Sequence, residues 1–159
     1  MKKAAFFENA KLLMDKLAII PLMYGSLGLE YITGESLNSD DIDILIPEVF
    51  LKERWEEFKN LLTDQGYILI DEHEHAFQKN GIHYAYASIE ELESFAKINL
   101  SEIEQQNNDG IWLKLLSLEQ YLKVYSTSAK DGYRINVRKK KDNNKIAFIE
   151  NRLKIKYNC

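Results

Sequence analysis

The chain has 159 residues, of which 45% are apolar and 29% are charged. This apolar content is enough to bury a core, and seven glycines with two prolines exclude collagen-like and low-complexity classes. No apolar run reaches the roughly 20 residues of a membrane span, and the first residues lack the pattern of a signal peptide. The one cysteine, Cys159, cannot form an internal disulfide, so we expect a cytoplasmic protein without membrane association.

The net charge of −4 is unevenly distributed along the chain. Residues 129–159 contain ten basic and three acidic residues, so this segment carries +7 and the rest of the chain carries −11. An acidic body with a basic tail could bring a polyanion beside an acidic, metal-binding cluster. A solvated helix face with no specific role would give the same charge pattern.

Five elements are expected in the first half of the chain. Apolar residues recur at intervals of three and four over residues 6–17, which predicts an amphipathic helix packed on a core. The following segments are predicted as a buried strand ended by a tight Gly-Ser turn (19–24), a polar loop (33–41), a strand of period two (42–46) and a helix (48–64).

The second half of the chain contains two hairpin signals. Asn80-Gly81 separates the predicted strands 74–79 and 82–88, and an Asn-Asn-Asp-Gly turn separates segments 98–106 and 110–117. A further strand is predicted over 67–71, and helices over 89–95, 118–128 and 143–154, the first two with capping boxes at Ser88 and Ser117.

This order of elements predicts an α+β fold with a mixed central sheet, flanking helices and a short C-terminal helical region. No repeat or change of composition forces a boundary, so residues 1–159 are expected to form a single domain. Within it, residues 117–159 could form a helical appendix.

The segment from Met23 to Pro47 carries the chemistry. Gly25-Ser26 ends a strand at a sharp turn, where exposed backbone N–H groups could approach a phosphate, and Gly28 adds a second place of close approach. Asp41 and Asp43 alternate with isoleucines, so both carboxylates should project from one face of a strand, about 6–7 Å apart. A divalent cation such as Mg²⁺ relieves the repulsion between two such carboxylates.

This pattern of Gly-Ser, a loop and Asp-apolar-Asp-apolar resembles the signature of the DNA polymerase beta-like nucleotidyltransferase superfamily. That superfamily includes antibiotic nucleotidyltransferases, tRNA-modifying enzymes and bacterial toxins. The resemblance implies that Gly25 and Ser26 hold the triphosphate of an NTP and that Asp41 and Asp43 are catalytic and bind Mg²⁺. Fourteen residues separate Ser26 from Asp41, which is longer than the family's usual gap, and Asp40 is a competing first carboxylate.

A second, looser resemblance covers residues 115–153. This segment is similar to the C-terminal helical region of small nucleotidyltransferases related to the AbiEii toxins. The positions that match are Lys123, Arg138, Lys141 and Asp142. The resemblance implies that Lys123, Arg138 and Lys141 contact the nucleotide.

The chain departs from the family where a third carboxylate normally lies. The predicted strand over residues 82–88 contains neither Asp nor Glu. Pairing across Asn80-Gly81 is expected to set Gln78 opposite His83 and Glu74 opposite Ala87, so Glu74 could supply the carboxylate. His83 could act as the base instead, and loss of activity is the remaining alternative.

Other polar clusters have simpler interpretations. His73 and His75 should share one strand face while His83 lies on the other, which disfavours a three-histidine zinc site. The run of residues 138–141 could contact phosphates or could only be solvated.

Two functions are therefore compatible with the sequence. The first is metal-dependent transfer of a nucleoside monophosphate from an NTP to a hydroxyl on a small molecule, an RNA or a protein. The second is a catalytically inactive module of the same fold that binds a nucleotide, an RNA or a partner protein. The chain is short for a separate acceptor-binding domain, so a homodimer could help to hold the acceptor.

Overall fold

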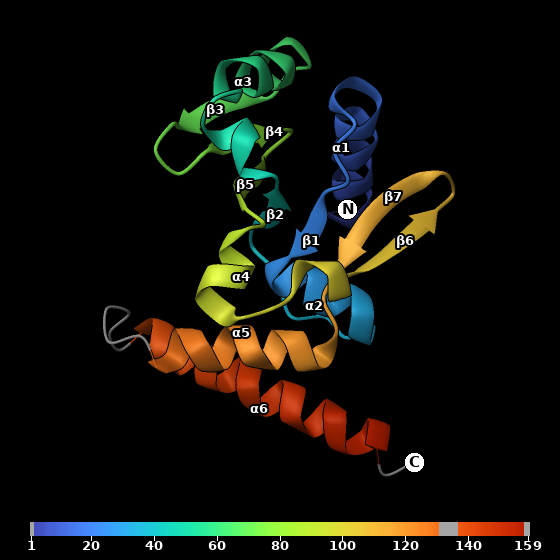
Figure 1. Ribbon diagram of the computed structural model, residues 1–159, viewed down its shortest axis with the longest axis vertical. Coiled ribbons are helices and arrows are strands. Elements are labelled where there is room, and N and C mark those ends of the chain that lie inside the picture. Colours follow the sequence, from blue (N-terminus) through green and yellow to red (C-terminus); the bar gives the residue numbers. More distant parts are fainter. Residues whose placement is uncertain (1, 131–136, 158–159) are drawn as a thin grey trace. The chain divides into compact units, whose positions relative to one another are not determined.

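A computed structural model describes residues 2–130 and 137–157, and side chains are described for residues 2–127 and 144–155. The chain divides into two compact units. The first unit contains residues 1–90 and 104–115, and the second contains residues 91–103 and 116–159. Figure 1 shows the elements in order of the chain.

The first unit is built on a mixed sheet of seven strands in the order β3-β4-β5-β2-β1-β7-β6. The pairs β1–β7 and β2–β5 are parallel and the other pairs are antiparallel. The strands are β1 (Leu22–Tyr24), β2 (Ile42–Ile46), β3 (Ile68–Asp71), β4 (Ala76–Lys79), β5 (Ile82–Ser88), β6 (Glu104–Asn108) and β7 (Ile111–Leu115). The predicted α+β fold with a mixed sheet is confirmed.

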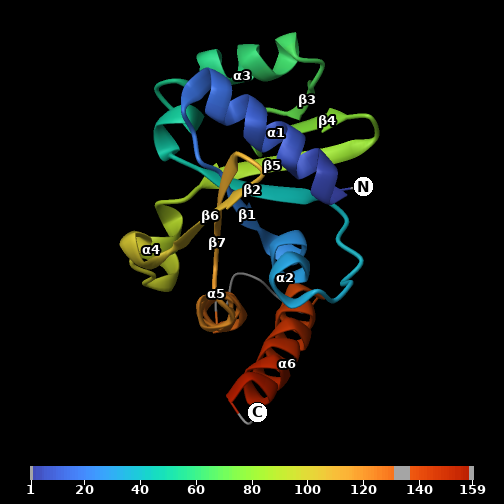
Figure 2. The same ribbon diagram turned by 90° about the vertical axis from the view of Figure 1, so that its right-hand side faces the viewer.

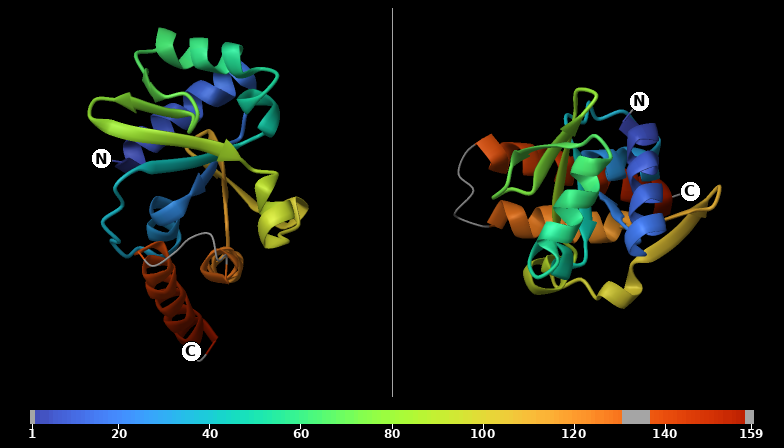
Figure 3. Two further views of the ribbon diagram at one scale, coloured as in Figure 1. Left: turned by 90° about the vertical axis from the view of Figure 1, so that its left-hand side faces the viewer. Right: turned by 90° about the horizontal axis from the view of Figure 1, so that it is seen from above.

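Helices α1 (Lys2–Leu17) and α3 (Trp55–Asp64) cover one face of this sheet (Figures 2 and 3). Phe6 and Leu13 of α1 and Phe58 of α3 are fully buried against that face. The alternate residues Ile42, Ile44 and Ile46 of β2 and Tyr84 and Tyr86 of β5 meet them. Because side chains alternate along a strand, Asp43 and Ala85 project from the opposite face.

Both predicted hairpins are confirmed. In the β4–β5 turn, Asn80 and Gly81 have φ of 53° and 76°, and in the β6–β7 turn Asp109 and Gly110 have φ of 53° and 86°. Two consecutive residues of positive φ match the twist of antiparallel strands, which explains the choice of Asn-Gly and Asp-Gly. The register of the β4–β5 hairpin is fixed by these turns.

The first unit departs from the predicted elements at two places. The turn at Gly25-Ser26 opens directly into α2 (Gly25–Thr33), a helix that the sequence pattern did not predict. The predicted helix over residues 48–64 is divided into a short 3-10 turn, η1 (Glu48–Leu51), and α3. The chain leaves helical geometry at Lys52, where φ is −126° and ψ is −94°. This break lets both Phe50 and Phe58 reach the core, with ring centroids 6.4 Å apart.

The second unit contains α4 (Glu91–Ala96), η2 (Leu100–Glu102), α5 (Leu118–Lys130) and α6 (Val137–Tyr157). Ser117 caps α5 as predicted: its Oγ accepts from Gln120 N at 3.1 Å, and its own N–H donates to Gln120 Oε1 at 2.9 Å. The predicted cap at Ser88 is wrong, because Ser88 belongs to β5 and its Oγ is buried without a hydrogen bond. Among the described residues, no helix is long and apolar enough to cross a membrane.

Candidate functional site

The candidate site lies where β1 passes into α2, next to the start of β2. The backbone pairing of β1 with β2 sets Tyr24 directly beside Asp43. Residue 25 follows with φ of 63°, a left-handed conformation that glycine adopts without steric cost. The structure therefore brings the predicted Gly25-Ser26 turn and the predicted Asp43 together.

Asp43 lies so close to Gly25 that no side chain fits between them. A Cβ atom at residue 25 would lie 2.5 Å from Asp43 Oδ2 and 3.3 Å from Asp43 Cβ and Cγ. The carboxylate thus sits at the positive end of the α2 dipole. The side chain of Tyr24, the N-cap residue, makes no capping hydrogen bond. Backbone N–H groups at such a helix start are suited to bind phosphate oxygens.

Asp41 directly precedes β2 and lies beside His83. The Nδ1 atom of His83 is 3.9 Å from Asp41 Oδ1, and both side chains are about half exposed. His83 alternates with the buried Tyr84, so it projects from the same face as Asp43 and Ala85. Asp41, Asp43 and His83 therefore share one face of the sheet.

The position that faces Asp43 from β5 is Ala85. A third carboxylate on this strand would have to occupy residue 85 or the neighbouring residue 83 to reach the aspartate pair, and these residues are alanine and histidine. Among the residues that the structure describes, no group of three His, Cys, Asp or Glu side chains could hold a metal ion.

Asp41 and Asp43 nevertheless have the donor chemistry of a magnesium site shared with a substrate. Magnesium ions bound by one or two carboxylates commonly take further ligands from substrate phosphates and water. The glycine at residue 25 allows the Asp43 carboxylate to approach the first turn of α2 closely, since any larger residue would push it away. The residues present fit a cation that arrives with a triphosphate.

The predicted pairing of Glu74 with Ala87 is wrong. The ladder between β4 and β5 ends at Ala76 and Ala85, and the Tyr86 N–H donates to the His75 carbonyl at 3.2 Å. Residues 72–75 form a turn in which Glu74 is exposed. Ala76 is two strand spacings from Asp43, about 10 Å, and Glu74 lies beyond it. The structure does not bring Glu74 to the aspartate pair.

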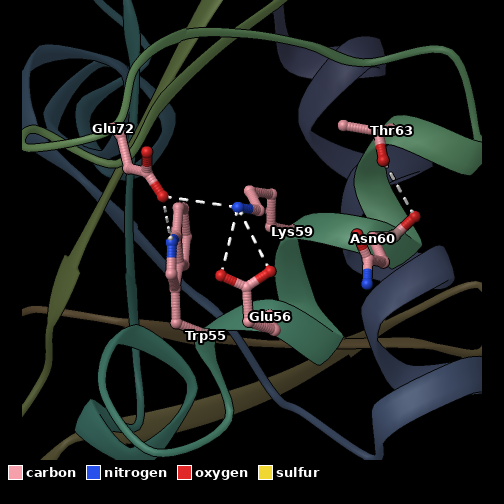
Figure 4. A network of polar contacts seen from close by, with 6 residues as sticks. All are labelled: Trp55, Glu56, Lys59, Asn60, Thr63 and Glu72. Carbon is pink, nitrogen blue, oxygen red and sulfur yellow. Dashed lines mark hydrogen bonds and ion pairs between the residues drawn. The ribbon is translucent and has the colours of Figure 1, made fainter.

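The turn at residues 72–75 is attached to α3 instead (Figure 4). Glu72 accepts hydrogen bonds from Trp55 Nε1 at 3.1 Å and from Lys59 Nζ at 3.3 Å. These two contacts, the Trp55 bond first, lower the pKa of Glu72. His75 packs edge-on against Trp55, with ring centroids 4.7 Å apart. His73 and His75 thus lie in a turn, and the prediction that they share a strand face is wrong.

The predicted nucleotide contacts of the C-terminal region fall in the second unit. Lys123 Nζ, on α5, donates to the Lys97 carbonyl at 2.7 Å, directly after α4. Arg138 and Lys141 belong to α6, but their side chains lie outside those that the structure describes. A nucleotide-binding role for these three residues stays a prediction.

The fold is similar to that of nucleotidyltransferase-like proteins of solved structure. An antigenic nucleotidyltransferase-like protein from Paracoccidioides brasiliensis superposes with a TM-score of 0.63 at 17% identity, over 92% of this chain and 74% of that one. The antibiotic-resistance factor ANT(2'')-Ia superposes with a TM-score of 0.54 at 12% identity, over 98% and 93% of the two chains. The structure of ANT(2'')-Ia in complex with adenylyl-2''-tobramycin superposes with a TM-score of 0.50 at 12% identity, over 96% of this chain and 99% of that one.

A closer relative is found by sequence. The chain is 41% identical over 144 residues to the uncharacterized protein YnaI of Bacillus subtilis strain 168, which covers 91% of this chain and 92% of YnaI. The chain therefore belongs to the same family as YnaI. No family model matches the sequence.

Proposed function

We propose that the chain is a metal-dependent nucleotidyltransferase that moves a nucleoside monophosphate from an NTP to a hydroxyl acceptor. The observation that carries this proposal is the contact of Gly25 with Asp43, because it sets a phosphate-binding helix start against a carboxylate. The nucleotidyltransferase fold supports the same proposal.

In this proposal the chain's own residues have separate tasks. The N–H groups at the start of α2, with Ser26, bind the triphosphate, and Asp41 and Asp43 hold Mg²⁺ against it. When bound, the cation neutralises charge that develops on the phosphates. The acceptor oxygen attacks the α-phosphorus, the bond from that phosphorus to the bridging oxygen breaks, and pyrophosphate leaves.

His83 is our candidate for the group that accepts the proton of the acceptor hydroxyl. It shares the face of the sheet with both aspartates, and its Nδ1 lies 3.9 Å from Asp41. A base must reach the reacting hydroxyl directly or through one water, and Glu74 is too remote for that. We also propose that the protein acts in the cytoplasm, since it has a single cysteine.

The test is transfer of label from each of the four α-³²P-labelled NTPs, with Mg²⁺, to a cell extract depleted of endogenous nucleotides. Asp43→Asn should abolish the transfer. Asp64→Asn is the matched control, because Asp64 is exposed at the end of α3, a helix that covers the opposite face of the sheet. Equal transfer by wild type and Asp43→Asn would contradict the proposal.

A catalytically inactive nucleotide-binding module is the second candidate function. The observation that favours it is Ala85, the residue beside Asp43 where a third carboxylate would be needed. Under this alternative the wild-type protein binds Mg²⁺ and an NTP, and Asp43→Asn abolishes binding, but no label is transferred to any acceptor. Turnover that depends on Asp41 and Asp43 would exclude it.

A further inference from the structure

The loop between α2 and β2 is fixed at its end by one carboxylate. Glu30, on α2, accepts three hydrogen bonds on the same oxygen, Oε1. The donors are Leu37 N at 2.9 Å, Ser39 N at 3.1 Å and Ser39 Oγ at 2.8 Å. Charge-assisted bonds of this kind are stronger than those between neutral groups.

Ser39 is held from a second side as well. Its carbonyl accepts a hydrogen bond from Lys2 Nζ, at the start of α1. Ser39 is therefore bonded through its N–H, its hydroxyl and its carbonyl, and it is only 8% exposed although it lies in a polar loop. The backbone at Ser39 is fixed two residues before Asp41.

Glu30 connects the two halves of the candidate site. It lies on the helix whose first residue, Gly25, contacts Asp43, and it is followed by the Gly34 cap that ends this helix. Asp43 is held within β2 by pairing on both sides, whereas Asp41 lies outside the strand. Asp41 thus depends on the loop for its position in a way that Asp43 does not.

We propose that Glu30 is a positioning residue that fixes Asp41 for metal and nucleotide binding; this inference rests on the proposed function. The seven residues 34–40, which join α2 to Asp41, form no helix or strand, and the hydrogen bonds to Glu30 hold the end of this segment that precedes Asp41. Groups that orient metal ligands typically affect affinity by about 10- to 100-fold.

Glu30 holds the loop through its acceptor oxygen, so Glu30→Gln and Glu30→Ala should affect the loop differently. The amide oxygen of glutamine can accept the same three hydrogen bonds, whereas alanine accepts none. Ser39→Ala removes only the hydroxyl bond and should have a smaller effect. Ser36→Ala is the matched control, because Ser36 is exposed in the same loop.

The first measurement is hydrogen exchange of the Leu37 and Ser39 amides by NMR in the protein without ligand. Glu30→Ala should speed their exchange by at least about tenfold, and Glu30→Gln should speed it less, because its neutral amide oxygen still accepts hydrogen bonds but without the charge. Unchanged exchange in Glu30→Ala would overturn the anchor. This result does not depend on any activity. Melting temperatures of all variants show whether each is folded.

The second measurement is the Kd of Mn²⁺ in the presence of a non-hydrolysable NTP, from water-proton relaxation. Glu30→Ala should weaken binding about 10- to 100-fold, and Ser36→Ala should not change it. One outcome overturns only the positioning role: wild type binds Mn²⁺ with the NTP, Asp43→Asn does not bind it, and Glu30→Ala binds it as tightly as wild type. If wild type itself does not bind, the proposed function fails, and the positioning role fails with it.

Discussion

Replacing Gly25 by alanine tests the contact that carries the proposed function. Two costs follow from the structure. The left-handed φ of 63° costs an L-residue about 1–2 kcal/mol. In addition, the new Cβ would lie 2.5 Å from Asp43 Oδ2, whereas ordinary contact begins at 3.4 Å, so the carboxylate must retreat by about 1 Å. A ligand to Mg²⁺ has to lie at about 2.0–2.1 Å, so such a displacement removes Asp43 from the metal.

Gly34→Ala is the matched control because it carries the first cost without the second. Gly34 ends the same helix with φ of 77°, and nothing lies within 4 Å of a Cβ placed there. Gly34→Ala should lose about 1–2 kcal/mol of unfolding free energy, which corresponds to about 2–8 °C in melting temperature, and Gly25→Ala should lose at least as much. Only Gly25→Ala should also lose affinity for Mn²⁺ with an NTP, by at least about tenfold.

Denaturant unfolding and Mn²⁺ titration on the same preparations give both quantities. Unchanged Mn²⁺ binding in Gly25→Ala would contradict the proposed role of the Gly25–Asp43 contact, because Asp43 would then bind the metal after being displaced from Gly25. If only Gly25→Ala lost stability, the expectation that a left-handed φ destabilises alanine equally at residues 25 and 34 would be wrong.

Three further predictions concern stability. Tyr86 is fully buried, and its hydroxyl makes no hydrogen bond of good geometry with its polar neighbour Asn9. Tyr86→Phe should therefore not lower the unfolding free energy by more than about 1 kcal/mol, as measured in urea; a larger loss would show that Asn9 is a true partner. Burial raises the pKa of Tyr67, Tyr84 and Tyr86, so these three of the nine tyrosines should stay neutral above pH 10 in the folded protein. Because the same side chains ionise in the unfolded chain, the unfolding free energy should fall above pH 10. Ionisation of all nine tyrosines in the folded protein, followed at 295 nm, would contradict this. Burial lowers the pKa of His75 below its usual 6.5, so the unfolding free energy should fall as the pH drops below 6.5. The fall should be less steep in His75→Asn. If the two proteins show the same slope of unfolding free energy against pH, other groups cause the loss.

Local patterns were sufficient to predict much of the sheet. The alternation of isoleucine and aspartate gave β2, and Asn-Gly and Asp-Gly gave both hairpins, because each signal needs only neighbours in sequence. α2 was missed because Gly25 and Gly28 lower helix propensity. Its stability comes from burial of Leu27 and Leu29, which depends on the tertiary fold.

The candidate site also combines features that neighbours in sequence determine with features that only the tertiary fold determines. The aspartate pair follows from period two along one strand, but its contact with Gly25 depends on pairing between β1 and β2, which no local pattern encodes. Glu74 was misplaced because the residues before Ala76 turn toward α3 instead of extending the strand. The role of Glu30 arises from a loop that returns to its own helix, and the only sequence signal is one carboxylate in an otherwise apolar stretch.

The most direct measurement of the central claim is a crystal structure with Mn²⁺ and a non-hydrolysable NTP, using the anomalous signal of manganese. If the proposed function is right, the peak lies within metal-ligand distance of both Asp41 and Asp43, with the triphosphate at the start of α2. A peak elsewhere, such as the histidine-containing turn at residues 72–75, or a triphosphate bound away from Gly25 and Ser26 would contradict it.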